Sequence, residues 1–99
     1  ELEINGVKMD LKKHEVTADG KTIVLTLKEF ELLEKLMKNQ NIVLTRDQLL
    51  TDIWGYDFDG ETRTVDVHIR TLRQKLGAYG SMIETIRGVG YRIGETNKR

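Results

Sequence analysis

The sequence has no cysteine and no long hydrophobic run, and each absence excludes a class of protein. Without cysteine, no disulfide can contribute to stability, and a reducing compartment is permitted. No apolar run approaches the roughly 18 residues that span a bilayer, and no signal-peptide pattern opens the chain. The 99 residues begin at Glu1 rather than methionine, so we expect a piece of a longer protein that forms one domain with a modest core.

Groups that could carry out catalysis are also scarce. Two histidines, His14 and His68, and one serine, Ser81, do not suggest a complete nucleophile–base–orienter set. The stretch Gly88-Val89-Gly90 lacks the third glycine of a dinucleotide-binding fingerprint, and no helix is expected after it. We therefore predict that the protein is not an enzyme and needs no cofactor.

The stretch GYDFDGE, residues 55–61, is an acidic loop that superficially suggests a calcium site. Gly60, however, stands at the wrong position for an EF-hand loop, and His68 occupies the place of its final glutamate. We predict no metal here and interpret the loop as solvated or in contact with another protein.

The formal net charge is zero, which by itself argues weakly against a nucleic-acid partner, because domains that bind nucleic acids are usually basic. The distribution of charge reverses that argument. Residues 1–61 hold 8 Lys/Arg and 13 Asp/Glu, a net charge of −5, whereas residues 62–99 hold 8 Lys/Arg and 3 Asp/Glu, a net charge of +5. Salt screens charges beyond about 10 Å, so the local field of the basic part can attract a polyanion.

Residues 2–25 alternate apolar and polar side chains with a period of two, as is typical of short strands. The dipeptides Asn5-Gly6 and Asp19-Gly20 suit tight hairpin turns, which need positive φ. These features predict a small antiparallel sheet in the N-terminal part of the chain.

A first helix is predicted to begin after Thr26. Thr26 and Glu29 form a Thr-x-x-Glu capping box, and Leu25 and Phe30 are placed as a hydrophobic staple. This helix should end near residues 39–41 and bury one stripe of side chains: Phe30, Leu33, Leu36 and Met37.

A second, shorter helix repeats the same start signals. Thr45 and Gln48 correspond to the cap, Leu44 and Leu49 correspond to the staple, and the helix should stop near Trp54-Gly55.

The stretch RTVDVHIRTLRQKL, residues 63–76, predicts a third helix that begins near Thr62. At about 100° per residue, one narrow arc of this helix is apolar and should be buried. Its members are Val65, Ile69, Leu72 and Leu76. The opposite face is polar apart from one valine, and it carries Arg63, Thr64, Val67, Arg70, Thr71 and Gln74.

That polar face has the chemistry to enter the major groove of DNA, which accepts a helix and displays base edges. Arg70 and Gln74 have planar heads with several donors, and Val67 can cover a thymine methyl group. Thr71 offers a hydroxyl and a methyl group to the same groove. Asp66 lies one turn before Arg70 and is expected to hold its guanidinium as an i,i+4 pair. The positions suited to phosphate contact beside this face are His68, Arg73 and Lys75.

After a loop at residues 77–80, the stretch MIETIRGVGYRI predicts a β-hairpin that turns at residues 88–90. Arg87 would stand on its protruding tip, which suits insertion into a minor groove. Taken singly, each feature has an ordinary alternative to DNA contact. The helix face can be a solvated surface, and the hairpin can need glycine only for its turn. Together they predict an α+β fold, a winged helix-turn-helix with an N-terminal antiparallel sheet. Residues 1–95 are assigned to this domain and 96–99 to a polar tail.

Four stretches in order resemble the OmpR/PhoB-type winged-helix effector domain of bacterial two-component response regulators: LTLKEFELLEKLMKN (25–39), TRDQLLTDIWG (45–55), RTVDVHIRTLRQKL (63–76) and IETIRGVGYR (83–92). The resemblance covers nearly the whole chain. It implies a four-stranded N-terminal sheet, three helices and a C-terminal wing. It also implies sequence-specific binding of double-stranded DNA and regulation of transcription, with residues 62–76 in the major groove and Arg87 in the minor groove.

The resemblance further implies two sets of contacting residues. The DNA-binding set is Arg46, Trp54, Arg63, Thr64, Val67, His68, Arg70, Thr71, Arg73, Gln74, Thr85, Arg87 and Tyr91. The loop that would contact RNA polymerase comprises residues 55–61, with Tyr56, Asp57, Phe58, Asp59 and Glu61. Thr71 departs from some family members, which carry arginine at that position, and the neutral charge departs from several members that are basic.

The resemblance also implies partners outside this chain. They are an N-terminal receiver domain, phosphorylated on aspartate by a sensor histidine kinase, and promoter DNA with direct repeats. The isolated domain is expected to be a monomer in the bacterial cytoplasm, and the phosphorylated full-length protein a dimer. A winged helix that binds protein or RNA is the alternative, because fold alone does not fix function.

Overall fold

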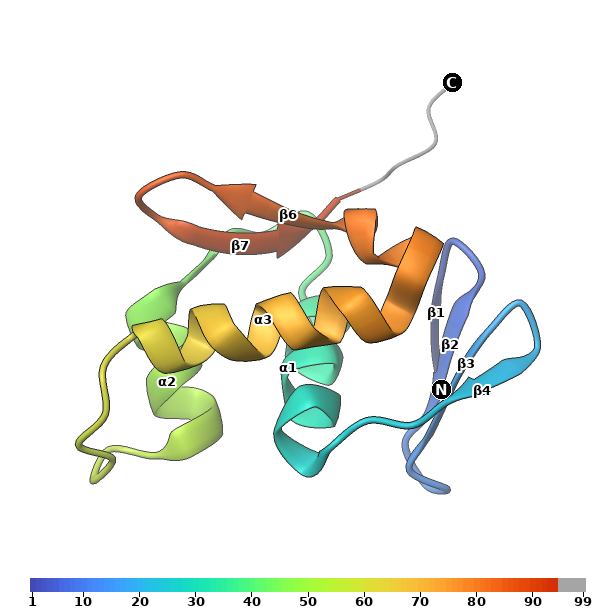
Figure 1. Ribbon diagram of the computed structural model, residues 1–99, viewed down its shortest axis with the longest axis horizontal. Helices are drawn as coiled ribbons and strands as arrows, with labels where there is room; N and C mark the ends of the chain where they lie inside the picture. The colour runs from blue at the N-terminus through green and yellow to red at the C-terminus, as the bar shows by residue number, and fades with distance from the viewer. Residues whose placement is uncertain (95–99) are drawn as a thin grey trace.

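The structure, a computed structural model, describes residues 1–94 and confirms the predicted α+β architecture (Figure 1). An N-terminal sheet lies at one end of the molecule, the three helices extend from it to the opposite end, and a β-hairpin lies beside the third helix. The predicted domain boundary after residue 95 and the tail at 96–99 lie outside the described residues. No helix within residues 1–94 is long and apolar enough to cross a membrane.

The N-terminal sheet has four antiparallel strands in the order β1-β2-β3-β4. They are β1 (Leu2–Ile4), β2 (Val7–Asp10), β3 (Glu15–Ala18) and β4 (Lys21–Ile23). The turn at Asn5-Gly6 has φ values of 51° and 90°, and the turn at Asp19-Gly20 has φ values of 50° and 82°. Positive φ at both central residues matches the twist of the flanking strands, so both predicted turns are confirmed.

Helix α1 (Leu27–Lys38) begins at the predicted capping box. The Thr26 hydroxyl accepts a hydrogen bond from the Glu29 N–H at 3.3 Å, and the Glu29 carboxylate accepts one from the Thr26 N–H at 2.9 Å. These bonds satisfy donors that the first turn of a helix leaves unpaired. The cap therefore fixes the position of the Glu29 carboxylate, which also lies against α3.

Helices α2 (Arg46–Trp54) and α3 (Arg63–Leu76) match the predicted ranges. The Thr45 hydroxyl caps α2 by accepting a hydrogen bond from the Gln48 N–H at 3.0 Å, and Gly55 ends the helix with a φ of 98°. Residues 55–61 therefore form the connection between α2 and α3.

The segment after α3 differs from the prediction. Residues predicted as a loop at 77–80 belong to a 3₁₀ helix, η1 (Gly77–Met82). Gly80 packs so close to α3 that a Cβ would lie 2.5 Å from the Arg73 carbonyl oxygen. Glycine is thus needed where the chain turns back from α3 toward the wing.

The wing contains the predicted hairpin, β6 (Ile83–Ile86) and β7 (Gly90–Ile93), and one further strand. Strand β5 (Leu44–Thr45) pairs with β7, so the wing sheet has the order β5-β7-β6. A Cβ at Gly90 would collide with the Leu44 carbonyl oxygen. This close pairing joins the end of β7 nearest the wing tip to the start of α2.

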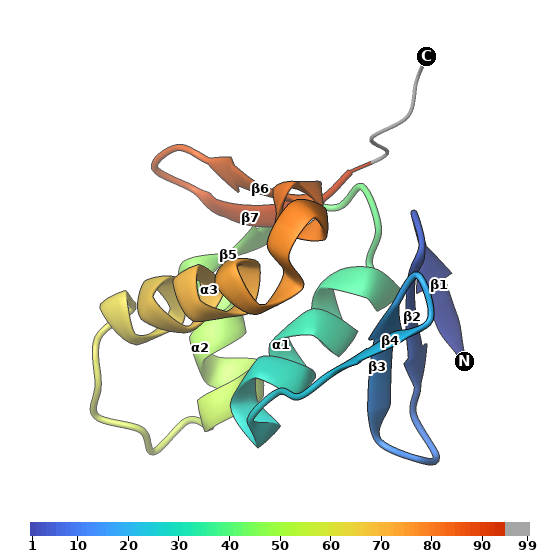
Figure 2. The same ribbon diagram turned by 45° about the vertical axis from the view of Figure 1, so that its right-hand side comes forward.

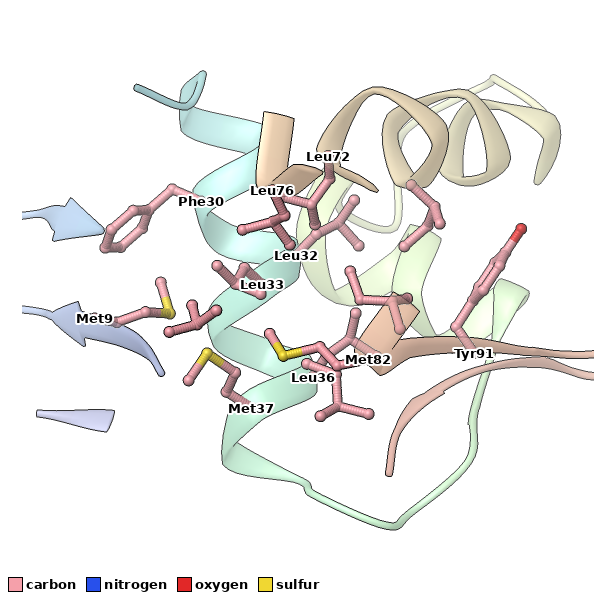
Figure 3. Packing of buried hydrophobic residues seen from close by; sticks show 14 of the residues in the cluster. Met9, Phe30, Leu32, Leu33, Leu36, Met37, Leu72, Leu76, Met82 and Tyr91 are labelled. Carbon is pink, nitrogen blue, oxygen red and sulfur yellow. The ribbon is translucent and has the colours of Figure 1, made fainter. Parts of the chain in front are cut away.

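The hydrophobic core surrounds α1, which lies between the N-terminal sheet and the other helices (Figure 2). Figure 3 shows Phe30 on the side of α1 toward the sheet, near Met9, and Leu32 on the side toward Leu72 and Leu76 of α3. The predicted apolar arc of α3, which is Val65, Ile69, Leu72 and Leu76, is at most 2% exposed. Burial of this arc decides which face of α3 points outward.

Candidate nucleic-acid interface

The outward face of α3 carries one row of exposed side chains. Arg63, Val67, Arg70 and Gln74 follow one another at helical spacing, and all four are exposed as predicted. Val67 is 51% exposed, although valine is among the residues most often buried. This exposed row combines planar donor groups with a branched apolar group, a mixture that suits base edges.

On the side of α3 that faces α1, three donors converge on the buried carboxylate of Glu29. The Lys75 ammonium lies 2.7 Å from it, the Thr71 hydroxyl donates at 2.8 Å, and the Thr26 N–H belongs to the cap. Burial by itself would raise the pKa of Glu29, but these hydrogen bonds, that from Lys75 foremost, outweigh it and lower the pKa to about 2. Thr71 and Lys75, predicted to face DNA, thus have a protein partner here.

At the N-terminal half of α3, the predicted contacts His68 and Trp54 pack against each other. Their ring centroids lie 4.9 Å apart with the planes at 72°. The His68 Nδ1 lies 2.9 Å from the Thr64 carbonyl oxygen, which can only accept a hydrogen bond, so Nδ1 carries the proton. Both contacts orient the imidazole at the border of the exposed row.

On the side of α3 that faces the wing, Asp66 accepts hydrogen bonds from two other elements. Arg46 of α2 donates through Nε at 3.0 Å and through Nη2 at 2.5 Å, and the Tyr91 hydroxyl of β7 donates at 2.6 Å. The predicted pair between Asp66 and Arg70 is therefore wrong, because the carboxylate is occupied by Arg46 and Tyr91. A helical spacing shows that two side chains can meet, but not which tertiary partner competes for them.

This cluster also shifts the titration of its members. Burial would raise the pKa of Asp66, but the hydrogen bonds from Arg46 and Tyr91 lower it overall. Burial and the hydrogen bond to Asp66 raise the pKa of Tyr91 to about 12. The carboxylate is therefore ionised and the phenol is protonated at neutral pH.

Arg73 attaches the edge of the wing to α3. Its guanidinium donates to the Ile83 carbonyl oxygen from Nε at 3.1 Å and from Nη2 at 2.6 Å, and to the Thr85 hydroxyl at 2.8 Å. It also lies 5.7 Å from the centroid of the Tyr91 ring, at the distance of a cation–π contact. The predicted contacts Arg73, Thr85 and Tyr91 thus gather at the joint between α3 and the wing.

The tip of the wing is held at the N-terminus of α2. The Arg46 N–H donates to the Val89 carbonyl oxygen at 3.3 Å, and the Val89 N–H donates to the Ile86 carbonyl oxygen at 2.9 Å. Both views place this tip on the same side of the molecule as the N-terminal half of α3 (Figures 1 and 2). The side chains of Arg70 and Arg87 are exposed, and neither forms a hydrogen bond or ion pair with any group of residues 1–94.

The loop at residues 55–61 is exposed along its whole length. Tyr56 is 93% exposed, whereas the Phe58 ring lies 6.1 Å from the Trp54 ring and covers Gly60. Within residues 1–94, no three histidine, cysteine, aspartate or glutamate side chains are arranged to hold a metal ion. The loop therefore presents carboxylates and one tyrosine to solvent.

Comparison with known proteins identifies the family to which this chain belongs. The family model described as "Transcriptional regulatory protein, C terminal" matches residues 20–93. The sensory transduction protein RegX3 of Mycobacterium tuberculosis is 47% identical over 95 residues, which are 93% of this chain and 42% of the relative. The chain thus spans less than half the length of the curated relatives that it matches.

Solved structures agree with the family match. The DNA-binding domain of the response regulator AdeR, solved in complex with an intercistronic region, has a TM-score of 0.84 and 32% identity, over 96% of this chain and 99% of that chain. The response regulator DrrB of Thermotoga maritima, an OmpR/PhoB homologue, has a TM-score of 0.83 and 34% identity, over 93% of this chain and 43% of that chain.

The chain therefore belongs to the family of C-terminal domains of transcriptional regulatory proteins. Within that family it is an OmpR/PhoB-type winged-helix effector domain of a response regulator, as the resemblance implied. This family consists of DNA-binding effector domains of transcriptional regulatory proteins and not of enzymes.

Proposed function

We propose that the domain binds double-stranded DNA sequence-specifically, with α3 in the major groove and Arg87 in the adjacent minor groove. The observation that carries this proposal is that α3 has an exposed row and that the wing tip lies on the same side of the molecule as the N-terminal half of this helix. Arg70 and Arg87 have no partner among residues 1–94, so neither loses a protein contact when it binds a phosphate or a base. Val67 and Gln74 complete the surface that reads the bases.

The remaining predicted contacts are proposed to bind the DNA backbone from the border of this surface. Arg63, at the start of α3, is exposed and is suited to a phosphate. His68 differs from the others, because the ring nitrogen that Thr64 does not occupy is an acceptor when Nδ1 carries the proton, and it therefore suits a donor on a base edge. We assign positioning roles, in addition to any backbone contact, to the predicted residues that already have protein partners, and these are Arg46, Trp54, Thr71, Arg73, Thr85 and Tyr91.

The larger regulator is also part of the proposal. RegX3 continues well beyond the region that this chain matches, which is consistent with a receiver domain that a sensor histidine kinase phosphorylates. We propose that a phosphorylated dimer in the bacterial cytoplasm binds direct repeats in promoter DNA and offers residues 55–61 to RNA polymerase. The exposed Tyr56 and the acidic side chains of the loop support a protein contact.

The test measures binding of the 99-residue chain to a duplex that it selects from a randomised pool, by fluorescence anisotropy at several salt concentrations. We expect Arg70→Ala and Arg87→Ala each to weaken binding at least tenfold. Where a phosphate contact is lost, the slope of the logarithm of the binding constant against the logarithm of the salt concentration should fall in magnitude by about one. Lys21→Ala, on the exposed edge of the N-terminal sheet, is the matched control and should change little. Unchanged affinity in both arginine variants would refute the proposal.

A third variant separates reading of bases from attraction to phosphates. Val67→Asp puts a charge in the middle of the exposed row, and we expect it to abolish the preference for the selected duplex over a scrambled one. Preference for the selected duplex that survives this substitution would show that α3 does not read bases. Stronger binding of the wild-type chain to RNA than to any duplex would favour the alternative winged-helix function.

A further inference from the structure

Asp66 is an anion on a surface that is proposed to receive a polyanion. Its side chain is 35% exposed and lies in the first turn of α3, between the exposed row and the wing. A carboxylate in this place repels phosphates, so electrostatics alone favours its removal. The contacts of Asp66 point to a structural role within the interface.

The Asp66 carboxylate joins three elements that each carry part of the interface. It belongs to α3 and accepts two hydrogen bonds from the guanidinium of Arg46, at the start of α2. It also accepts a hydrogen bond from the hydroxyl of Tyr91 in β7. The Arg46 backbone N–H in turn donates to Val89 in the wing tip. One chain of hydrogen bonds therefore runs from α3 through Arg46 to the residues beside Arg87.

We propose that Asp66 is a positioning residue that fixes the wing tip relative to α3, and so sets the distance between the major-groove and minor-groove contacts. This inference rests on the proposed mode of DNA binding. A rigid joint matters because the two grooves of a duplex lie at a fixed separation, and a side chain misplaced by about 1 Å makes a poor contact. Replacing the carboxylate by an amide removes the charge and the oxygen that accepts from Arg46 Nη2, so the link from α3 through Arg46 to the wing tip weakens, while Arg73 still joins α3 to β6.

Substitution by asparagine separates positioning from electrostatics, because the two effects have opposite signs. Asp66→Asn removes a negative charge, so electrostatics predicts tighter binding of the selected duplex, whereas loss of positioning predicts weaker binding. Asp47→Asn is the matched control, since Asp47 is exposed in the first turn of α2, acts on Arg46 only through its charge and forms no ion pair within residues 1–94. We expect Asp66→Asn to weaken binding by at least about threefold and Asp47→Asn to leave it equal or slightly tighter.

A double-mutant cycle tests whether Asp66 acts through the wing. We expect Arg87→Ala to weaken binding much less in the Asp66→Asn background than in the wild type, because a displaced tip no longer makes the contact. A residue that contributed only to folding would leave the Arg87→Ala effect unchanged, provided that circular dichroism shows both proteins folded at the assay temperature. Tyr91→Phe keeps the ring and removes one donor to Asp66. In this background, too, we expect Arg87→Ala to weaken binding less than in the wild type, but the difference should be smaller than with Asp66→Asn.

The outcomes distinguish this inference from the proposed function. If Arg70→Ala and Arg87→Ala leave binding unchanged, the mode of DNA binding is wrong, and the role of Asp66 is wrong with it. If both arginine variants weaken binding but Asp66→Asn tightens it as Asp47→Asn does, only the positioning role is wrong. An unchanged Arg87→Ala effect in the Asp66→Asn background would have the same meaning.

Discussion

Two carboxylates tie α3 to its neighbours on opposite sides of the helix, Glu29 of α1 and Asp66 of α3 itself, and they differ mainly in burial. The Glu29 side chain is 5% exposed and ties α3 to the cap of α1, whereas the Asp66 side chain is 35% exposed and ties α3 to α2 and the wing. Both accept several hydrogen bonds and both have lowered pKa values. The comparison teaches that one kind of interaction has two uses. We expect the buried carboxylate of Glu29 to contribute chiefly to stability, and the half-exposed carboxylate of Asp66 chiefly to the geometry of the surface.

The largest effect is expected at the buried side. Glu29→Gln keeps the shape of the cap but removes the charge that Lys75 and Thr71 bind, so we expect the free energy of unfolding at pH 7 to fall by about 3 kcal/mol. Urea denaturation followed by circular dichroism measures this difference. Glu31→Gln, at an ion pair of 3.6 Å on the exposed side of α1, is the control and should cost less than about 1 kcal/mol.

Acid should abolish the difference in free energy of unfolding between the wild type and Glu29→Gln. The pKa of Glu29 is about 2 in the folded chain and about 4.5 when unfolded, so its charge stabilises the fold fully above the unfolded value. That contribution is lost as pH falls from about 4.5 to about 2. We expect the wild type and Glu29→Gln to converge in free energy of unfolding over this range. A difference that stays constant from pH 6 to pH 2.5 would contradict the lowered pKa.

The smallest effect on stability is expected at the half-exposed side. Tyr91→Phe removes the hydroxyl that donates to Asp66, and water can replace it because the carboxylate is partly exposed. We expect a loss of about 1 kcal/mol in the free energy of unfolding, measured by urea denaturation. A loss as large as that of Glu29→Gln would show that burial does not separate the two clusters.

The fold was predictable where local signals decide it. The turns at Asn5-Gly6 and Asp19-Gly20, the capping box at Thr26 and the glycine at the end of α2 each act through neighbouring residues, so the sequence reveals them. Strand β5 has two residues and forms only because β7 pairs with it, and η1 follows the close packing of Gly80 on α3. Neither has a periodic pattern of its own.

The candidate site was predictable to the same extent. The exposed row on α3 follows from helical periodicity, and Arg87 follows from the hairpin turn. The partners of Asp66 and Lys75 do not follow, because they lie 20 to 46 residues away in sequence. Glu29 was visible only as a cap, since its second role depends on how α1 packs against α3.

By itself, the sequence determined the order of the elements, the buried arc of α3 and the basic character of its outward face, because these depend on spacing and residue type. The tertiary structure alone decided which polar groups stay available to a partner. Hydrogen-bonding groups are shared among all elements that reach them. Packing brings Glu29 close enough to bind Thr71 and Lys75, and it brings Arg46 and Tyr91 together on Asp66.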